Sequence, residues 1–144
     1  MRVQVLIQVP AWGFVKRHRG GQVDFVSPLP CPFNYGEIPG TLATDGDALD
    51  AVMLGKRLAA GRSVQGSVLG AVDFYDAGRR DIKVICGSIP LSPLQRLTLM
   101  WWFRGYAWAK RLINLSRGLR GTTAAKGWLP EDQTCAHIEQ LDEQ

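Results

Sequence analysis

Aliphatic and polar residues alternate at the start of the chain, where the aliphatic positions are Val3, Val5, Ile7 and Val9. A period of two places successive side chains on opposite faces of a strand, so it predicts a β-strand over Val3–Pro10. Shorter runs of the same kind predict three further strands, over Gln22–Val26, Val64–Phe74 and Asp81–Cys86. Closely spaced strands separated by turns are typical of a small β-barrel. In contrast, the segment Ser27–Gly40 is rich in proline, and we expect it to be irregular and extended.

The last third of the chain has a helical pattern. Ser92 and Pro93 form a helix start, with Ser as the N-cap and Pro in the first turn. The pattern predicts a long helix from Pro93 to about Ser116, and a last short helix opening at Pro130. The apolar face of the long helix is expected to contain Leu94, Leu97, Trp101 and Trp108. The tryptophans of this helix, Trp101, Trp102 and Trp108, are predicted to pack in the core. Any exposed part of this helix is a candidate subunit interface.

Length and composition fit one globular domain over residues 1–144. The chain has 144 residues, of which 46% are hydrophobic and 21% charged. The start has no secretory signal pattern, and the most apolar stretch, Leu97–Trp108, is interrupted by Arg104, so no membrane span is expected. Three scattered cysteines, Cys31, Cys86 and Cys135, predict buried thiols in a reduced, cytoplasmic protein.

Charge is distributed unevenly along the chain. The net charge is +4, yet seven of the thirteen acidic residues lie between Glu37 and Asp81. Between Ile82 and Pro130 there are eight Lys or Arg and no acidic residue. The two halves could form the walls of a site for metal ions and an anion, or they could be a solvated surface. A nucleic-acid partner is compatible with the charge but is not expected.

The segment Asp45-Gly46-Asp47-Ala48-Leu49-Asp50 is the main candidate for chemistry. Three carboxylates within six residues repel one another unless cations neutralise them. Hard oxygen ligands favour Mg²⁺ or Mn²⁺. The spacing does not fit an EF-hand loop, and a solvated Asp-Gly turn is the alternative.

A second acidic cluster comprises Asp73, Asp76 and Asp81, followed by Lys83. Asp81 and Lys83 are two residues apart on a predicted strand, so they share a face. A carboxylate and an ammonium on one face can hold a metal ion and a phosphate together. The alternative is a surface ion pair on a hairpin, which contributes little to stability.

Further candidate anion ligands are scattered along the chain. Lys16, Arg17 and Arg19 could bind an anion or solvate a turn. Tyr35, in Asn34-Tyr35-Gly36, could donate to a phosphate or pack in the core. No nucleophile elbow, Walker A or dinucleotide-binding motif is present, so metal-activated water acting on a polyanion is the chemistry that fits.

Two of these segments together resemble the signature of soluble family I inorganic pyrophosphatases. Pro32–Leu42 reads PFNYGEIPGTL, similar to the family's P-x-N-Y-G-x-I-P-x-T, and Asp45–Asp50 reads DGDALD, similar to D-G-D-P-x-D. Val5–Pro10 resembles the opening strand of the family. Asp76 and Asp81 followed by Lys83 resemble its D-x-x-x-x-D-x-K hairpin, and Tyr106 falls where the family has a Tyr-Lys pair.

The resemblance implies a β-rich α+β fold, with a five-stranded OB-like barrel and flanking helices, one of them long and C-terminal. It also implies Mg²⁺-dependent hydrolysis of pyrophosphate to two phosphates. Carried over by position, the metal ligands would be Asp45, Asp50, Asp76 and Asp81. Asp47 would be the base or orienter for water, and the phosphate contacts would be Lys16, Tyr35, Lys83 and Tyr106.

The chain also departs from the family pattern. The family's first-strand Glu is Gln8, a second Glu is replaced by His18, and the Lys of the Tyr-Lys pair is Ala107. An Arg expected upstream of Asn-Tyr-Gly has no counterpart within Gln22–Phe33, and Ala48 replaces a proline. These losses remove two negative charges from the metal side and two positive charges from the phosphate side.

Two pairs of arginines, Arg79 with Arg80 or Arg17 with Arg19, are candidates to compensate for the lost cations. Two other functions stay open: hydrolysis of another polyphosphate or nucleotide, and binding of metal and phosphate with weak or no turnover. A homo-oligomer is possible.

Overall fold

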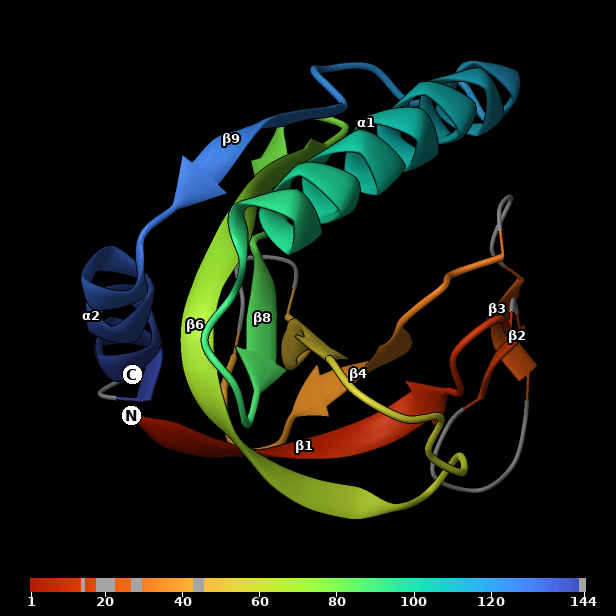
Figure 1. The fold of residues 1–144 in the computed structure, drawn as a ribbon. Helices are drawn as coiled ribbons and strands as arrows, with labels where there is room; N and C mark the ends of the chain where they lie inside the picture. The colour runs from red at the N-terminus through yellow and green to blue at the C-terminus, as the bar shows by residue number, and fades with distance from the viewer. Residues whose placement is uncertain (14, 18–22, 27–29, 43–45, 143–144) are drawn as a thin grey trace.

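The computed structural model describes residues 1–13, 15–17, 23–26, 30–42 and 46–142, and Figure 1 shows the fold. The strands are β1 (Arg2–Val9), β2 (Val15–Arg17), β3 (Val23–Val26), β4 (Asn34–Ile38), β5 (Leu49–Met53), β6 (Ser63–Asp76), β7 (Arg79–Arg80), β8 (Lys83–Gly87) and β9 (Ala124–Leu129). The helices are α1 (Pro93–Ser116) and α2 (Glu131–Asp142).

Five strands close into a ring. The strands pair in the order β1, β4, β5, β8 and β6, and β6 pairs back to β1. The β5–β8 pair is parallel and the other pairs of the ring are antiparallel. The long strand β6 also carries β7 and β9, while β2 and β3 form a separate two-stranded sheet. The predicted five-stranded OB-like arrangement with flanking helices is confirmed.

The strands of the ring bury two apolar clusters, one on each side of β5, β6 and β8. The first receives side chains from all five ring strands, so it lies at the centre of the ring, and Ile138 of α2 joins it. The second contains Val52, Val72 and Ile85 and is covered by α1 through residues such as Phe103. Alternation along each strand therefore sends neighbouring residues into different cores. In Figure 1, α1 lies along one side of this sheet, across β6 and β9.

Helix α1 begins and ends where the sequence predicts. Ser92 forms a capping box with Gln95, and Pro93 is in the first turn. The orientation predicted for the helix was wrong, however. Its buried apolar residues are Leu99, Met100, Phe103 and Ala107. Trp101 and Trp108 are 64% and 62% exposed, and Trp102 is partly buried.

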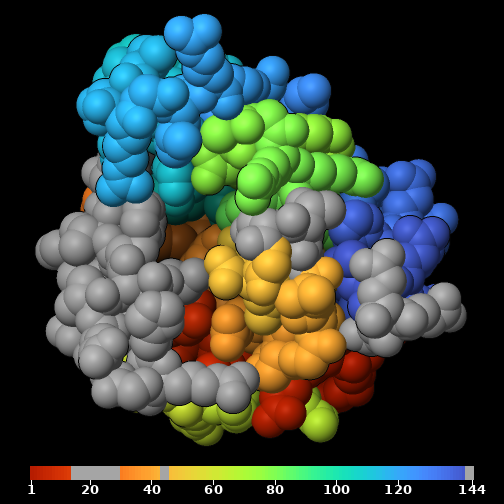
Figure 2. All heavy atoms as spheres, turned by 180° about the vertical axis from the view of Figure 1, so that it is seen from behind, coloured from red at the N-terminus to blue at the C-terminus, as the bar shows by residue number. Residues whose placement is uncertain are grey.

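Five strands among the described residues were not predicted: β2, β4, β5, β7 and β9. β4 lies inside the proline-rich segment that was expected to be irregular, and β9 follows α1. β4 forms because it is paired on both sides, by β1 and by β5, which satisfies its backbone groups. β9 is added to the free side of β6. Figure 2 shows the molecule from behind, where the orange and gold of β4 and β5 lie between the green of the β6–β7 hairpin and the red of β1.

The Asn-Tyr-Gly sequence in β4 has two structural roles. Asn34 is fully buried, and its Oδ1 accepts from the amides of Ala11 (3.0 Å) and Leu58 (2.9 Å). Its Nδ2 donates to the carbonyls of Met53 (3.2 Å) and Lys56 (2.8 Å). Asn34 therefore joins β4 to the segments that follow β1 and β5. Gly36 lies where a Cβ would meet the carbonyl oxygen of Leu6, so β1 and β4 could not approach with a larger residue there.

No helix within the described ranges has the length and apolar character needed to cross a membrane. All three cysteines are free. Cys31 and Cys86 are buried, as predicted, whereas Cys135 is only partly buried.

We predict that Asn34→Ala lowers the free energy of unfolding by about 3 kcal/mol or more, because it leaves three buried backbone groups and one partly buried backbone group without a partner. Urea unfolding measures the change. Gln65→Ala, at an exposed position of β6, is the control and should stay within about 0.5 kcal/mol of the parent. Equal stabilities for the two variants would contradict this role of Asn34.

Candidate functional site

Three charged residues form a row across adjacent strands: Glu37 in β4, Asp50 in β5 and Lys83 in β8. Glu37 is paired in register with Asp50, and Asp50 is paired with Lys83. Residues paired in this way project from the same face of a sheet. Val52 and Ile85, two residues further along β5 and β8, belong to the apolar cluster under α1. The charged row therefore lies on the same face of the sheet as the apolar cluster that α1 covers.

Lys83 lies at the centre of this row. Its Nζ is 2.6 Å from Oδ2 of Asp50 and 2.7 Å from Oδ2 of Asp81. The Lys83 side chain is 4% exposed, whereas the two carboxylates are 15% and 14% exposed. Burial alone would lower the pKa of Lys83, but the two carboxylates outweigh it and raise the pKa well above its ordinary value. Lys83 is therefore a fixed positive charge at neutral pH.

Two tyrosines flank the ammonium. Lys83 Nζ lies 5.8 Å from the centre of the Tyr35 ring. Burial, followed by the charge of Asp50, raises the pKa of Tyr35 well above its ordinary value. Tyr106 of α1 is stacked on Trp102, and burial raises its pKa to about 12, with Asp50, Asp76 and Asp81 adding to the shift. Both phenols therefore remain protonated at neutral pH and can donate hydrogen bonds.

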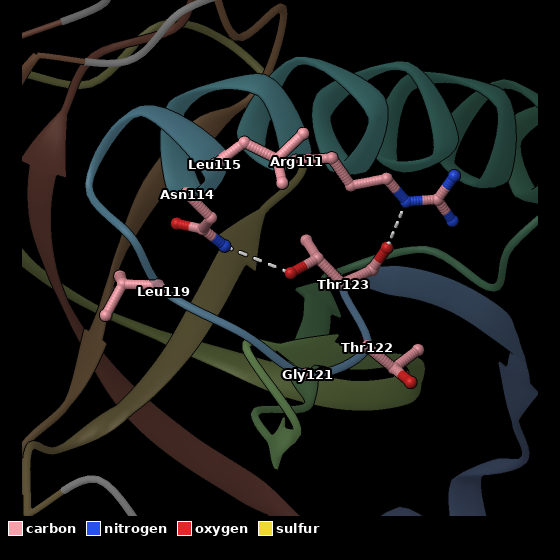
Figure 3. A pocket seen from close by; sticks show the side chains of 7 residues that line it. All are labelled: Arg111, Asn114, Leu115, Leu119, Gly121, Thr122 and Thr123. Carbon is pink, nitrogen blue, oxygen red and sulfur yellow. Dashed lines mark hydrogen bonds between the residues drawn. The ribbon is translucent and has the colours of Figure 1, made fainter.

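Asp76, at the end of β6, is held by α1. Its Oδ1 accepts from Nδ2 of Asn114 (2.9 Å), and its Oδ2 lies 3.5 Å from Nζ of Lys110. Asn114 also donates to Oγ1 of Thr123 (3.0 Å), and Nε of Arg111 donates to the carbonyl of Thr123 (2.6 Å). Figure 3 shows the bonds from Asn114 and Arg111 to Thr123. Hydrogen bonds from side chains of α1 thus hold both the segment after α1 and the end of β6.

The cavity drawn in Figure 3 has a volume of about 360 Å³. It lies between the last turns of α1 and the segment Gly121–Thr123, and its lining contains no carboxylate. The polar groups of Asn114 and Arg111 in it are hydrogen bonded within the chain. Asn114, in the wall of this cavity, also holds Asp76.

The structure brings together most of the residues that the sequence singled out. Contacts and electrostatic coupling connect Tyr35, Asp50, Asp76, Asp81, Lys83 and Tyr106. Asp47 is exposed in the bend before β5. Of the remaining predicted site residues, Asp45 lies outside the described residues, and Lys16 is in β2 with a side chain outside the described part. His18, which stands where the family has a Glu, also lies outside the described residues.

Three residues at this site were missed by the sequence reasoning: Glu37, Lys110 and Asn114. Glu37 occupies a variable position of the family motif, but the pairing of β4 with β5 places it opposite Asp50. Lys110 and Asn114 follow Tyr106 by four and eight residues, and helical spacing puts all three on one side of α1. That spacing was the available signal.

The departures from the family pattern also have defined positions. Gln8 is buried, and its Oε1 has no hydrogen-bond partner among the described residues. Ala107 is on the buried face of α1. Arg80 donates from Nε to Asp73 (3.0 Å), so one of the arginines expected to compensate is bonded to a carboxylate that does not contact Lys83. Arg17 is in β2, with a side chain outside the described part, and Arg19 lies outside the described residues.

The donor set suits a hard divalent cation. Asp50 and Asp81 each bond Lys83 through one carboxylate oxygen and have a second, and carboxylate oxygens are preferred ligands of Mg²⁺. Within the described ranges, no three His, Cys, Asp or Glu side chains gather into a complete metal site. The residues present therefore fit part of a cation shell.

We predict that the stability conferred by Tyr106 is lost in alkali. Its folded pKa is about 12 and its ordinary pKa is 10.0, so the folded state holds the proton more tightly. The contribution is complete below pH 10 and is lost as the pH rises toward 12. Tyr106→Phe should reduce this fall, which is on the order of 1–3 kcal/mol, in urea unfolding measured across the window. Tyr75→Phe controls for loss of a hydroxyl, and an unchanged profile in Tyr106→Phe would contradict the assignment.

Comparison with known proteins identifies the family of the chain. The family model of inorganic pyrophosphatases matches residues 14–111. The chain is 41% identical over 68 residues to the inorganic pyrophosphatase of Haemophilus influenzae. The aligned segment covers 45% of this chain and 39% of the relative. The chain is 30% identical over 103 residues to that of Aeropyrum pernix, covering 66% of this chain and 57% of the relative. The matched segments thus span less than two thirds of these relatives.

Solved structures show the same fold. An inorganic pyrophosphatase from Neisseria gonorrhoeae superposes with a TM-score of 0.79 at 24% identity, covering 99% of this chain and 90% of the other. One from Helicobacter pylori gives 0.81 at 21% identity, covering 99% and 92%. The family match over more than half of the residues, together with the charged row between β5 and β8, leads to one assignment: the chain belongs to the inorganic pyrophosphatase family.

Proposed function

We propose that the chain hydrolyses inorganic pyrophosphate to two phosphates with the help of a divalent cation, Mg²⁺ or Mn²⁺. The observation that carries the proposal is the buried Lys83 ammonium between Asp50 and Asp81, flanked by two protonated tyrosines, in a chain of this family. Three free cysteines support a reducing, cytoplasmic setting.

The reaction adds one water across a P–O–P bond. The water oxygen bonds to one phosphorus, the bridging oxygen leaves with the other phosphate, and the two water protons end on the products. A bound divalent cation would neutralise the substrate and lower the pKa of the attacking water. Asp45, Asp50, Asp76 and Asp81 are the proposed ligands. Asp47, exposed in the bend before β5, is the proposed base that takes a proton from the water.

The other residues hold the substrate. Lys83 supplies positive charge that is already buried and oriented, so little reorganisation is needed when a phosphate arrives. Tyr35 and Tyr106 stay neutral and donate from their hydroxyl groups, since their raised pKa values prevent a repulsive phenolate. Lys16 is proposed as a further phosphate ligand. These groups hold the substrate in line for attack.

Lys110 is proposed to replace the cation lost at Ala107. Its Nζ is 3.5 Å from Asp76 and 6.0 Å from the centre of the Tyr106 ring, so it lies beside two residues of the proposed site. Glu37, opposite Asp50, is proposed to restore a negative charge lost at Gln8.

Phosphate release from pyrophosphate, with and without Mg²⁺, tests the proposed activity. We expect Mg²⁺-dependent release, and a loss in kcat of about 100-fold or more for Asp47→Asn, because a general base contributes at least that much. Asp73→Asn, which removes the partner of Arg80, is the matched control and should keep parental activity. Faster release from a nucleoside triphosphate would identify a shifted substrate. No release from the folded chain at any metal concentration would reject the proposal in favour of a binding protein.

A separate measurement tests Lys110. Lys110→Ala should raise KM for pyrophosphate about tenfold with a smaller effect on kcat, since the charge grips the substrate. Lys126→Ala removes an exposed cation next to Tyr75, outside the site, and should leave KM unchanged. The role of Lys110 fails if both variants have the parental KM.

A further inference from the structure

The β6–β7 hairpin ends in a tight turn with an unfavourable backbone conformation. Asp76 pairs with Arg79, so the turn consists of two residues, Ala77 and Gly78. Their φ angles are +51° and +85°, as a type I′ hairpin turn requires. Glycine adopts a positive φ readily, whereas in alanine the Cβ crowds the following carbonyl oxygen. A strained residue of this kind persists where its surroundings fix it, so contacts from outside the hairpin are expected.

Those contacts come from the segment that follows α1. The amide of Ala77 donates to Oγ1 of Thr123 (3.0 Å). The amide of Gly78 donates to the carbonyl oxygen of Thr122 (2.8 Å). Gly121 packs against the same turn, because a Cβ at this position would lie 2.6 Å from the carbonyl carbon of Ala77. We call Gly121, Thr122 and Thr123 the docking segment, since together they hold the turn.

The docking segment is itself fixed to α1, and α1 also holds Asp76. Thr123 is buried, and its Oγ1 accepts a second hydrogen bond from Nδ2 of Asn114 (3.0 Å). The same Nδ2 donates to Oδ1 of Asp76 (2.9 Å). Figure 3 shows Thr123 between Asn114 and Arg111, whose Nε donates to the Thr123 carbonyl oxygen (2.6 Å). The hydroxyl of Thr123 thus meets both the amide that follows Asp76 and the side chain that holds its carboxylate.

The carboxylate of Asp76 depends on this arrangement more than the other acidic residues of the site do. Asp50 and Asp81 are bonded to Lys83 within the sheet. Asp76 lies instead at the end of β6, next to the turn, so its direction follows the turn and Asn114. The Asp76 side chain is 31% exposed, and a carboxylate oxygen that accepts one hydrogen bond keeps a lone pair for a cation.

We propose that Thr123 is a positioning residue for Asp76: its hydroxyl fixes both the β6–β7 turn and Asn114, and thereby sets the affinity of the site for a divalent cation. The inference rests on the proposed function, since it takes Asp76 as a cation ligand. Thr123 itself touches neither cation nor substrate. Without the hydroxyl, the Ala77 amide and Asn114 lose a shared partner, the turn can relax from its disfavoured conformation, and the carboxylate loses its fixed direction.

Amide hydrogen exchange of the metal-free chain, followed by NMR, tests the docking of the turn. Thr123→Val keeps the shape of the side chain and removes the hydroxyl, so the Ala77 amide should exchange about tenfold faster. Thr123→Ser keeps the hydroxyl and should retain the parental protection. Thr134→Val is the matched control, because Thr134 is also buried and its hydroxyl bonds two carbonyl oxygens at the start of α2. Unchanged exchange of the Ala77 amide in Thr123→Val would overturn the proposal.

The affinity for Mn²⁺, measured by electron paramagnetic resonance without substrate, tests the consequence for the site. Loss of a group that orients a metal ligand weakens metal binding by about tenfold or more, and we expect about tenfold for Thr123→Val. Thr123→Ser and Thr134→Val should keep the parental affinity, although Thr134→Val also loses a buried hydroxyl. Parental affinity in Thr123→Val would reject the positioning role. A parent chain that does not bind Mn²⁺ would reject the proposed function itself, and the role of Thr123 with it.

Gly121→Ala displaces the turn in a second, independent way. The added Cβ would meet the carbonyl carbon of Ala77, so the turn and the docking segment must separate. Gly55→Ala is the matched control: its φ of +116° is similar to the +105° of Gly121, but nothing lies within 4 Å of the added Cβ. Both variants share the backbone strain, and only Gly121→Ala should weaken Mn²⁺ binding. Equal affinities in the two variants, both shown to be folded by circular dichroism, would contradict the proposal.

Discussion

The site depends on one buried ammonium, that of Lys83. Asp50 lies in β5, and Asp81 lies just before the neighbouring strand β8. Without a cation between them, the two carboxylates would repel each other. Because β5 and β8 are parallel neighbours, Lys83 lies in register with Asp50. Asp81 precedes Lys83 by two residues in the chain. The pairing of these strands thus places the three charges together before any ligand is present, which is the preorganisation that a site for a polyanion requires.

The same strands serve stability and chemistry through alternation. In β5, Leu49 and Ala51 face the centre of the ring, while Asp50 and Val52 face α1. A shift of one residue in the pairing would bury Asp50 in the apolar centre, so the register that stabilises the ring also fixes the site. The hydrogen bonds of Asn34 hold the ends of β4 and β5 in that register. Helix α1 completes the arrangement, because it both covers the apolar part of the face and holds Asp76 through Asn114.

Local signals in the sequence were sufficient for part of this structure. Ser92 and Pro93 determine where α1 begins. The strand alternation predicted β1, β6 and β8 of the ring, and the acidic motifs singled out Asp50, Asp81 and Lys83 as candidates, which the fold brings together. The orientation of α1 could not be predicted, because both of its sides are apolar: Phe103 is buried and Trp101 is exposed, and periodicity does not distinguish them. β4 was missed because its pairing partners are distant in sequence and its flanks are rich in proline. The proposed role of Lys110 could not be predicted from the sequence, because it depends on the fold placing Lys110 next to Asp76.

We propose that the Lys83 ammonium organises a site for pyrophosphate, and the steady-state kinetics of Lys83→Gln, together with its urea unfolding curve, test this role. Asp50 and Asp81 are partly exposed, so water can solvate them when the ammonium is removed. The account predicts a folded variant whose kcat/KM for pyrophosphate falls by about 100-fold or more, with Lys83→Arg recovering part of the loss. A folded Lys83→Gln chain that releases phosphate at the parental rate would contradict it.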